Sequence, residues 1–171
     1  MATTTLRFLN IILAALLAGT SFGIWMGFNP VNFSPSTYVE VQQNTIRMLH
    51  VLMVSLVIIA TIVTITSAFL QRNDKHVFIA LLVAAVFFIA CILISRFGNK
   101  PIQDDMLTWN ANSLPANWTI LRDQWWSFHV MRTITELIAL AIIAWVSIRK
   151  GNSTTTHTVL PKAGLTEVTK L

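Results

Sequence analysis

Charged residues are scarce in this chain: they make up 11% of its 171 residues, against about 25% in ordinary soluble domains. Hydrophobic residues make up 54% and lie in long blocks, which excludes a disordered, fibrous or conventional water-soluble protein. A single cysteine, Cys91, excludes an intramolecular disulfide framework and a multi-cysteine metal site. The net charge of +5 comes from residues between and after the apolar blocks, which does not resemble the clustered charge of a nucleic-acid binder.

Four apolar segments are long enough to cross a hydrocarbon core about 30 Å thick at about 1.5 Å per helical residue. They cover residues 8–28, 46–70, 77–95 and 126–148. We therefore predict an all-α four-helix transmembrane bundle over residues 1–150, followed by a flexible polar tail over 151–171. A secretory signal is the alternative for the first segment, but its apolar stretch is longer than such signals require.

Positive charges predict the orientation of the bundle. Arg7, the short connection with Arg72 and Lys75, and the basic end of the fourth span all fall on one side of a four-span chain. We expect this side to be the cytoplasm, with both termini inside and the Trp- and Asn-rich segment 96–125 as an extracytoplasmic loop. A chain this short with brief cytoplasmic connections is typical of a multi-pass protein of the bacterial inner membrane, with the lipid bilayer as its partner.

Small residues recur at four-residue spacing in the first span. Helices in lipid associate through close backbone approach, which small side chains permit. We expect this face to pack against a neighbouring span, and a homo-oligomer through the same residues is the alternative. The residues are Ala15, Gly19, Gly23 and Gly27.

Ionisable residues inside a membrane span are costly and usually face the bundle interior or a water-filled cavity. His129, Arg132 and Glu136 are three and four residues apart, so they share one helical face. Arg47 and His50 in the second span are likewise three apart. His50 and Arg132 are expected about one turn inside their spans, so both groups are predicted to meet in one outer-leaflet pocket.

Each of these features has a purely structural alternative. Arg132 and Glu136 can form a structural ion pair in a low-dielectric bundle. Arg47 can extend toward the lipid headgroups, and Trp109 and Trp118 can belong to an interfacial belt. His50 and His129, together with a carboxylate, suit a metal or an axial haem, but they lie on different spans and no metal-ligand spacing occurs on one helix.

Two runs between the third and fourth spans resemble the DUF1772, or anthrone oxygenase-like, family of small four-span membrane proteins. The first is Asn99-Lys100-Pro101-Ile102, which matches an Asn-x-Pro turn after the third span. The second begins Arg122-Asp123-Gln124-Trp125 and continues to His129 and Arg132. The resemblance covers about residues 8–148, and its specific part lies in these runs.

This resemblance implies an integral membrane oxidoreductase that oxidises an anthrone, a lipophilic aromatic small molecule, with dioxygen. Removal of a proton from the acidic CH₂ group gives an enolate that reacts directly with O₂, so no cofactor is required. The chemistry needs a base, a donor for the enolate oxygen and a flat apolar slot. His50 or His129 is the base candidate, Arg132 the oxyanion donor, and Glu136 its orienting partner. The substrate-binding residues implied are Arg47, Asn99, Trp109, Arg122, Trp125 and Trp126.

Two other functions compete with this hypothesis. One is a non-catalytic bundle that binds a lipid or small molecule or serves as an accessory subunit. The other is a transporter or channel subunit, which we rank last because the predicted inner half of the bundle, around 58–70 and 137–145, lacks any charge and the chain shows no inverted repeat.

Overall fold

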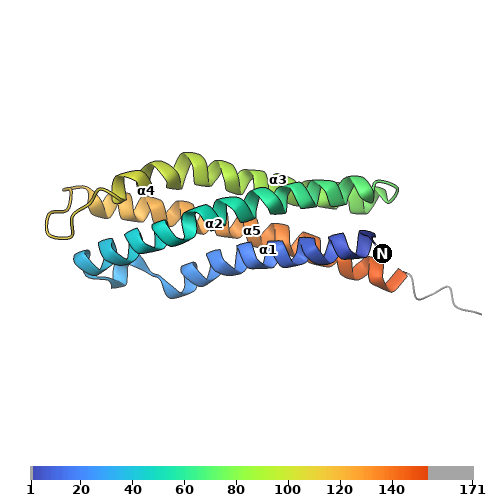
Figure 1. The fold of residues 1–171 in the computed structure, drawn as a ribbon, viewed down its shortest axis with the longest axis horizontal. Coiled ribbons are helices and arrows are strands. Elements are labelled where there is room, and N and C mark those ends of the chain that lie inside the picture. Colours follow the sequence, from blue (N-terminus) through green and yellow to red (C-terminus); the bar gives the residue numbers. More distant parts are fainter. Residues whose placement is uncertain (1, 154–171) are drawn as a thin grey trace, which may run out of the picture.

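The computed structural model describes residues 2–153, and these form an antiparallel bundle of long helices (Figure 1). The predicted polar tail, residues 151–171, begins within the last helix, which extends to Ser153, and the rest of it lies outside the described residues. The main helices are α1 (Ala2–Gly27), α2 (Pro35–Leu70), α3 (Lys75–Ile94), α4 (Lys100–Met106) and α5 (Trp118–Ser153). A short 3₁₀-helix, η1 (Pro30–Asn32), joins α1 to α2, and a π-helix, η2 (Ser95–Asn99), joins α3 to α4.

Four helical segments are long and apolar enough to cross a membrane, which confirms the predicted all-α transmembrane bundle. The N-terminus and the end of α5 lie at the same end of the bundle, as four spans require (Figure 1). Two helix starts have side-chain caps of the expected kind. The Ser34 hydroxyl accepts from the Thr37 amide at the start of α2, and Asp74 Oδ1 accepts from the Val77 amide at the start of α3.

The predicted loop 96–125 is mostly helical, and only residues 107–117 lack helical structure. Proline at position 101 normally ends a helix, because its ring clashes with the carbonyl four residues earlier and it has no amide hydrogen. Here the chain widens into the π-helix η2 just before Pro101, and the Lys100 amide donates to the carbonyl of Ser95. The third span therefore continues through η2 into α4, and the Asn-x-Pro run is not a turn.

The outer parts of α2, α4 and α5 enclose a second core beyond the main apolar one. Tyr38, Met106, Trp109 and Trp125 are buried there, and the Tyr38 hydroxyl donates to Met106 Sδ at 3.7 Å. Because the helices extend to surround this core, Arg132 lies about 21 Å, or about four turns, from the start of α5. The prediction that the polar residues lie about one turn from their helix ends is therefore wrong.

The small-residue face of α1 points away from the rest of the chain, so the prediction of intramolecular packing there is wrong. Gly19, Gly23 and Gly27 are exposed, and a Cβ atom at any of them would meet nothing within 4 Å. The packing face of α1 is instead the one with Ala14, Leu17, Ala18 and Ser21, all fully buried. Close approach of α1 to α2 and α5 depends on the alanines of that face.

Gly98 lies in η2 directly against α5, and we expect Gly98→Ala to destabilise the protein. A Cβ at this position would lie 2.7 Å from Phe128 Cγ and Cδ1, so α5 or the π-helix must move. Overpacking of this kind costs about 1–3 kcal/mol. Thermal unfolding in detergent measures the change. The control is Gly19→Ala, which meets open space and should leave the melting temperature unchanged or slightly raised; equal melting temperatures for the two variants would contradict the packing described here.

Candidate active site

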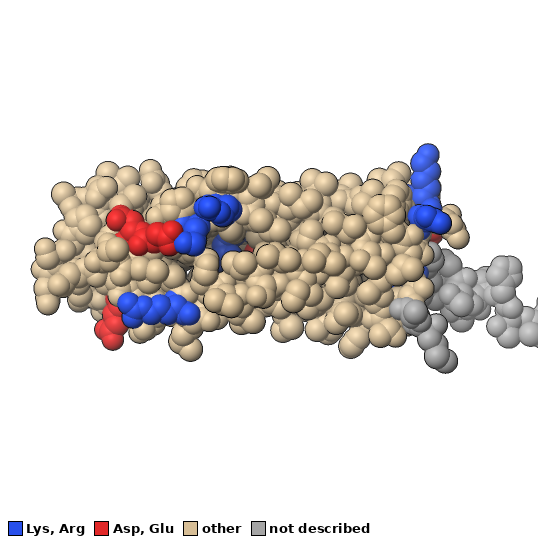
Figure 2. Space-filling view, turned by 45° about the horizontal axis from the view of Figure 1, so that its top comes forward, with Lys and Arg blue, Asp and Glu red and all other residues tan. Residues whose placement is uncertain are grey.

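An elongated cavity of about 250 Å³ lies between α2 on one side and α3, η2 and α4 on the other. Its floor is formed by α1 and α5, and Figure 2 shows the hollow on this face, with basic side chains at its rim. The lining runs from Cys91 to Gln103 along α3–η2–α4, a distance of about 18 Å. Aliphatic side chains and Trp125 make up half of the lining. The other half is polar or charged and consists of Thr45, His50, Cys91, Ser95, Arg96, Asn99, Lys100, Gln103, Arg132 and Glu136.

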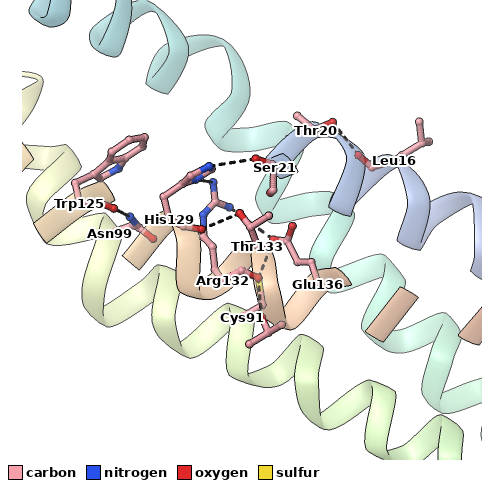
Figure 3. Close-up of polar contacts among 11 residues, drawn as sticks. Leu16, Thr20, Ser21, Cys91, Asn99, Trp125, His129, Arg132, Thr133 and Glu136 are labelled. Atoms are coloured by element: carbon pink, nitrogen blue, oxygen red, sulfur yellow. Dashed lines mark hydrogen bonds and ion pairs between the residues drawn. The ribbon is translucent and has the colours of Figure 1, made fainter. Parts of the chain in front are cut away.

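The inner end of the cavity holds a carboxylate with an unusual set of partners (Figure 3). Glu136 is fully buried, and its Oε1 accepts a hydrogen bond from Cys91 Sγ at 3.0 Å. Arg132 Nη1 lies 3.8 Å from the same oxygen. The Ser21 hydroxyl of α1 and Glu136 Oε2 are both buried, and neither has a hydrogen-bond partner among residues 2–153. One acceptor oxygen of this lining residue is therefore buried and unsatisfied in the described part of the chain.

His129 contacts the guanidinium of Arg132 on the side away from the cavity. Arg132 Nη2 lies 3.0 Å from His129 Nδ1, and since a guanidinium only donates, Nδ1 is the acceptor. The other ring nitrogen, Nε2, then carries the hydrogen and donates to the Ser21 carbonyl at 3.2 Å. The ring is fully buried and stacks on Trp125 and Trp126, with centroid distances of 5.3 and 5.6 Å.

This arrangement separates the roles that the sequence assigns to the two histidines. His129 does not line the cavity and both of its nitrogens are engaged, so it orients Arg132 and has no free nitrogen to accept a proton from a ligand. His50, on α2, is half-buried and lines the cavity opposite the α5 floor.

The outer half of the floor joins two residues from the family-like runs. Asn99 is buried at the end of η2, and its Nδ2 donates to the carbonyl of Trp125 at 3.0 Å. Both residues line the cavity. Asn99 Oδ1 and Trp125 Nε1 are buried and have no hydrogen-bond partner among residues 2–153, so an acceptor and a donor are unsatisfied near a space that a ligand can fill.

The remaining predicted substrate-binding residues are not part of the lining. Arg47 is exposed, and Arg122 Nε pairs with Asp123 Oδ1 at 2.8 Å while its guanidinium lies over the Trp118 ring. Trp109 belongs to the outer core, where its Nε1 donates to Asp105 at 3.3 Å. Trp126 contributes through its stacking on His129.

On the third span and its continuation, sequence reasoning predicted Asn99 but missed the other residues of the same helical face. Cys91, Ser95, Asn99 and Gln103 follow one another at four-residue spacing and all line the cavity. That spacing would have indicated one helical face, but Pro101 argued against a helix continuing through this segment.

The described residues do not provide the donor set for a metal. Within residues 2–153, no group of three or more His, Cys, Asp or Glu side chains lies close enough together to hold an ion. His129 uses both nitrogens in the contacts above, so it does not fit the predicted alternative of a metal or haem shared with His50.

A comparison with protein-family models gave a match to one described as Anthrone oxygenase, over residues 43–142. The match covers more than half of the chain and includes every lining residue named above from α2, α3, η2, α4 and α5. Searches of curated proteins and of solved structures gave no match.

Proposed function

Because the chain belongs to the anthrone oxygenase family, we propose that it is an integral membrane oxidoreductase that oxidises a lipophilic aromatic substrate with dioxygen in the cavity. The observation that carries this proposal is the pairing of Arg132 with Glu136 at the inner end of a laterally open groove whose α2 side is largely aliphatic. A guanidinium and an available carboxylate oxygen side by side supply the donor and the base that enolate chemistry needs.

The shape of the cavity supports a membrane-dissolved aromatic substrate. Val54 and Ile58 line it and are themselves exposed, so the groove opens between α2 and α3 on the lipid-facing side. Its volume of about 250 Å³ is just below the range of about 300–1,000 Å³ usual for ligand pockets. A compact, flat molecule of a few fused rings suits this space better than a long acyl chain.

In the proposed reaction Glu136 Oε2 takes one proton from the CH₂ group of the anthrone, and Arg132 stabilises the enolate oxygen. The enolate carbon then forms a bond to O₂, and return of the proton gives a hydroperoxide. Glu136 removes the second proton from the same carbon as the O–O bond breaks, which forms the new carbonyl and expels hydroxide. Glu136 then returns this proton to the hydroxide, which leaves as water. One substrate and one O₂ thus give one quinone and one H₂O.

The surrounding residues support this division of labour. His129 and the Ser21 carbonyl orient Arg132, and the Cys91 thiol leaves one Glu136 oxygen free by binding the other. His50 faces the cavity from α2 and is the second candidate for the base. Asn99 and Trp125 border the aromatic slot and offer a carbonyl oxygen and an indole N–H to substrate hydroxyl groups or water.

We further propose that the end of the bundle with the termini faces the cytoplasm of a bacterial cell. Arg7, Arg72 and Lys75 lie at that end, as the positive-inside tendency requires. The cavity then opens in the outer leaflet. The exposed face of Gly19, Gly23 and Gly27 stays a predicted contact surface for a second copy of the chain.

We expect the purified protein in lipid nanodiscs to convert anthrone to anthraquinone well above the spontaneous rate. The proposed base and oxyanion donor both act on the slow proton removal, and each contributes about 10²-fold or more. Quinone absorbance measures the product, and empty nanodiscs give the uncatalysed rate. A rate equal to that of empty nanodiscs for anthrone and for hydroxylated or carboxylated anthrones would contradict the proposal.

A further inference from the structure

The exposed rim of the cavity, near the middle of its length, carries a cation without an acidic partner. Arg96 lies in η2, lines the cavity and is exposed. Its guanidinium carbon lies 5.9 Å from the centre of the Phe97 ring, and among residues 2–153 no carboxylate pairs with it. Lys100, the next basic lining residue, is already paired, with its Nζ 2.6 Å from Asp104 Oδ2. Of the two basic residues at the rim of the cavity, Arg96 is therefore the one that remains available to a ligand.

Arg96 is also within one small molecule's length of the proposed reaction centre. Cys91, which contacts Glu136, lies five residues earlier on the same continuous helix, a rise of about 7 Å along the axis. A fused-ring substrate whose reacting carbon lies at Glu136 and Arg132 would place its outer ring near Arg96. The charges of the lining favour an anion there, because Arg96 and Arg132 face a single carboxylate, that of Glu136, once Lys100 is paired with Asp104.

We propose, resting on the proposed function, that the substrate carries an anionic group on its outer ring, a carboxylate or an ionised acidic phenol, and that Arg96 binds it. A guanidinium binds a carboxylate through two parallel hydrogen bonds, which also sets the orientation of the ring. The group enters the groove last, so the polar end of an amphipathic substrate stays near the mouth while the apolar rings fill the aliphatic part. Arg96 would thereby determine the orientation of the bound substrate and so which of its edges lies against Glu136.

The test compares two substrates and two variants of the full chain in nanodiscs of zwitterionic lipid. The substrates are anthrone and anthrone-2-carboxylic acid, and the variants are Arg96→Gln and Arg72→Gln. Arg72 is exposed and lies at the opposite end of the bundle, so its variant removes the same charge away from the cavity. We expect Arg96→Gln to raise the KM for the carboxylate about tenfold or more, with the KM for anthrone unchanged. Arg72→Gln should change neither.

A second measurement separates this inference from the proposed function. Binding of the product analogue anthraquinone-2-carboxylate is measured by calorimetry and requires no turnover. Weaker binding to Arg96→Gln, partly restored by the charge of Arg96→Lys, supports the anion site even if no anthrone is oxidised. Unchanged binding and unchanged KM in an active protein overturn the Arg96 proposal alone. An equal rise of KM for both substrates also overturns the proposal, because it would indicate that Arg96 has a structural role. Weaker binding of the product analogue that appears only in nanodiscs of anionic lipid overturns it too, because Arg96 would then act on lipid headgroups.

Discussion

Arg132→Gln should lower kcat for anthrone oxidation by about 10²–10³-fold, the usual cost of removing one oxyanion donor. Arg132 is the guanidinium whose orientation is held by His129 Nδ1 at 3.0 Å, and its side chain is only 11% exposed. The enolate oxygen gains negative charge as the proton leaves, so the loss should appear in kcat and not in KM alone. Steady-state kinetics of quinone formation measure both parameters.

Two comparisons make the Arg132 prediction specific. Arg132→Lys keeps the charge but loses the planar fork that contacts both His129 and Glu136, so we expect an intermediate loss. Arg72→Gln, remote from the cavity, should match the unaltered protein. Thermal unfolding of each variant in detergent shows whether it remains folded. A folded Arg132→Gln protein with unchanged kcat would remove Arg132 from the reaction and leave the structural ion pair as its role.

Glu136→Gln should lower kcat by about 10²–10⁴-fold, as expected for loss of a general base. The substitution keeps the size of a fully buried side chain and its ability to accept from Cys91, but an amide does not take a proton from carbon. The slow step then depends on water or a weaker base. Single-turnover quinone formation with excess protein measures the chemical step directly.

The matched control for this change is Glu40→Gln. Glu40 is exposed on α2 and does not line the cavity, so the same chemical substitution there should have no effect. His50→Asn distinguishes the second candidate base. If His50→Asn abolishes turnover while Glu136→Gln retains it, the base is His50 and the assignment of Glu136 is wrong.

Apolar length was sufficient to predict the four spans, since a stretch of about 20 predominantly apolar residues has few alternatives to a membrane helix. The continuation of the third span was not predictable in this way. Pro101 ordinarily marks a helix boundary, and the helix continues through it by way of the π-helix over Ser95–Asn99, in which Gly98 lies directly against Phe128 of α5. A contact between two distant parts of the chain thus overrides a local signal.

The candidate site was partly predictable for the same reason. Helical periodicity places His129, Arg132 and Glu136 on one face of α5, and the structure shows them there. Periodicity does not reveal that α3 lies against that face and brings Cys91 within 3.0 Å of Glu136. Periodicity also does not reveal that Arg132 lines the cavity whereas His129 does not.

The four-residue spacing of small residues that includes Gly19 and Gly23 did not predict which face of α1 packs against the rest of the chain. Small residues permit close helix approach, both within a chain and between chains. The alanines of α1 at positions 14 and 18 provide the same opportunity on another face, and the chain packs on that one. Composition alone does not distinguish two such faces.

The most direct test of the account is the ratio of dioxygen consumed to quinone formed, measured with an oxygen electrode and absorbance on the same nanodisc sample with anthrone in excess. Direct oxygenation in the cavity predicts one O₂ per quinone, at a rate that Arg132→Gln and Glu136→Gln both reduce to near the level of empty nanodiscs. Tight binding of anthrone without oxygen uptake above that level would contradict the account and identify a non-catalytic binding protein.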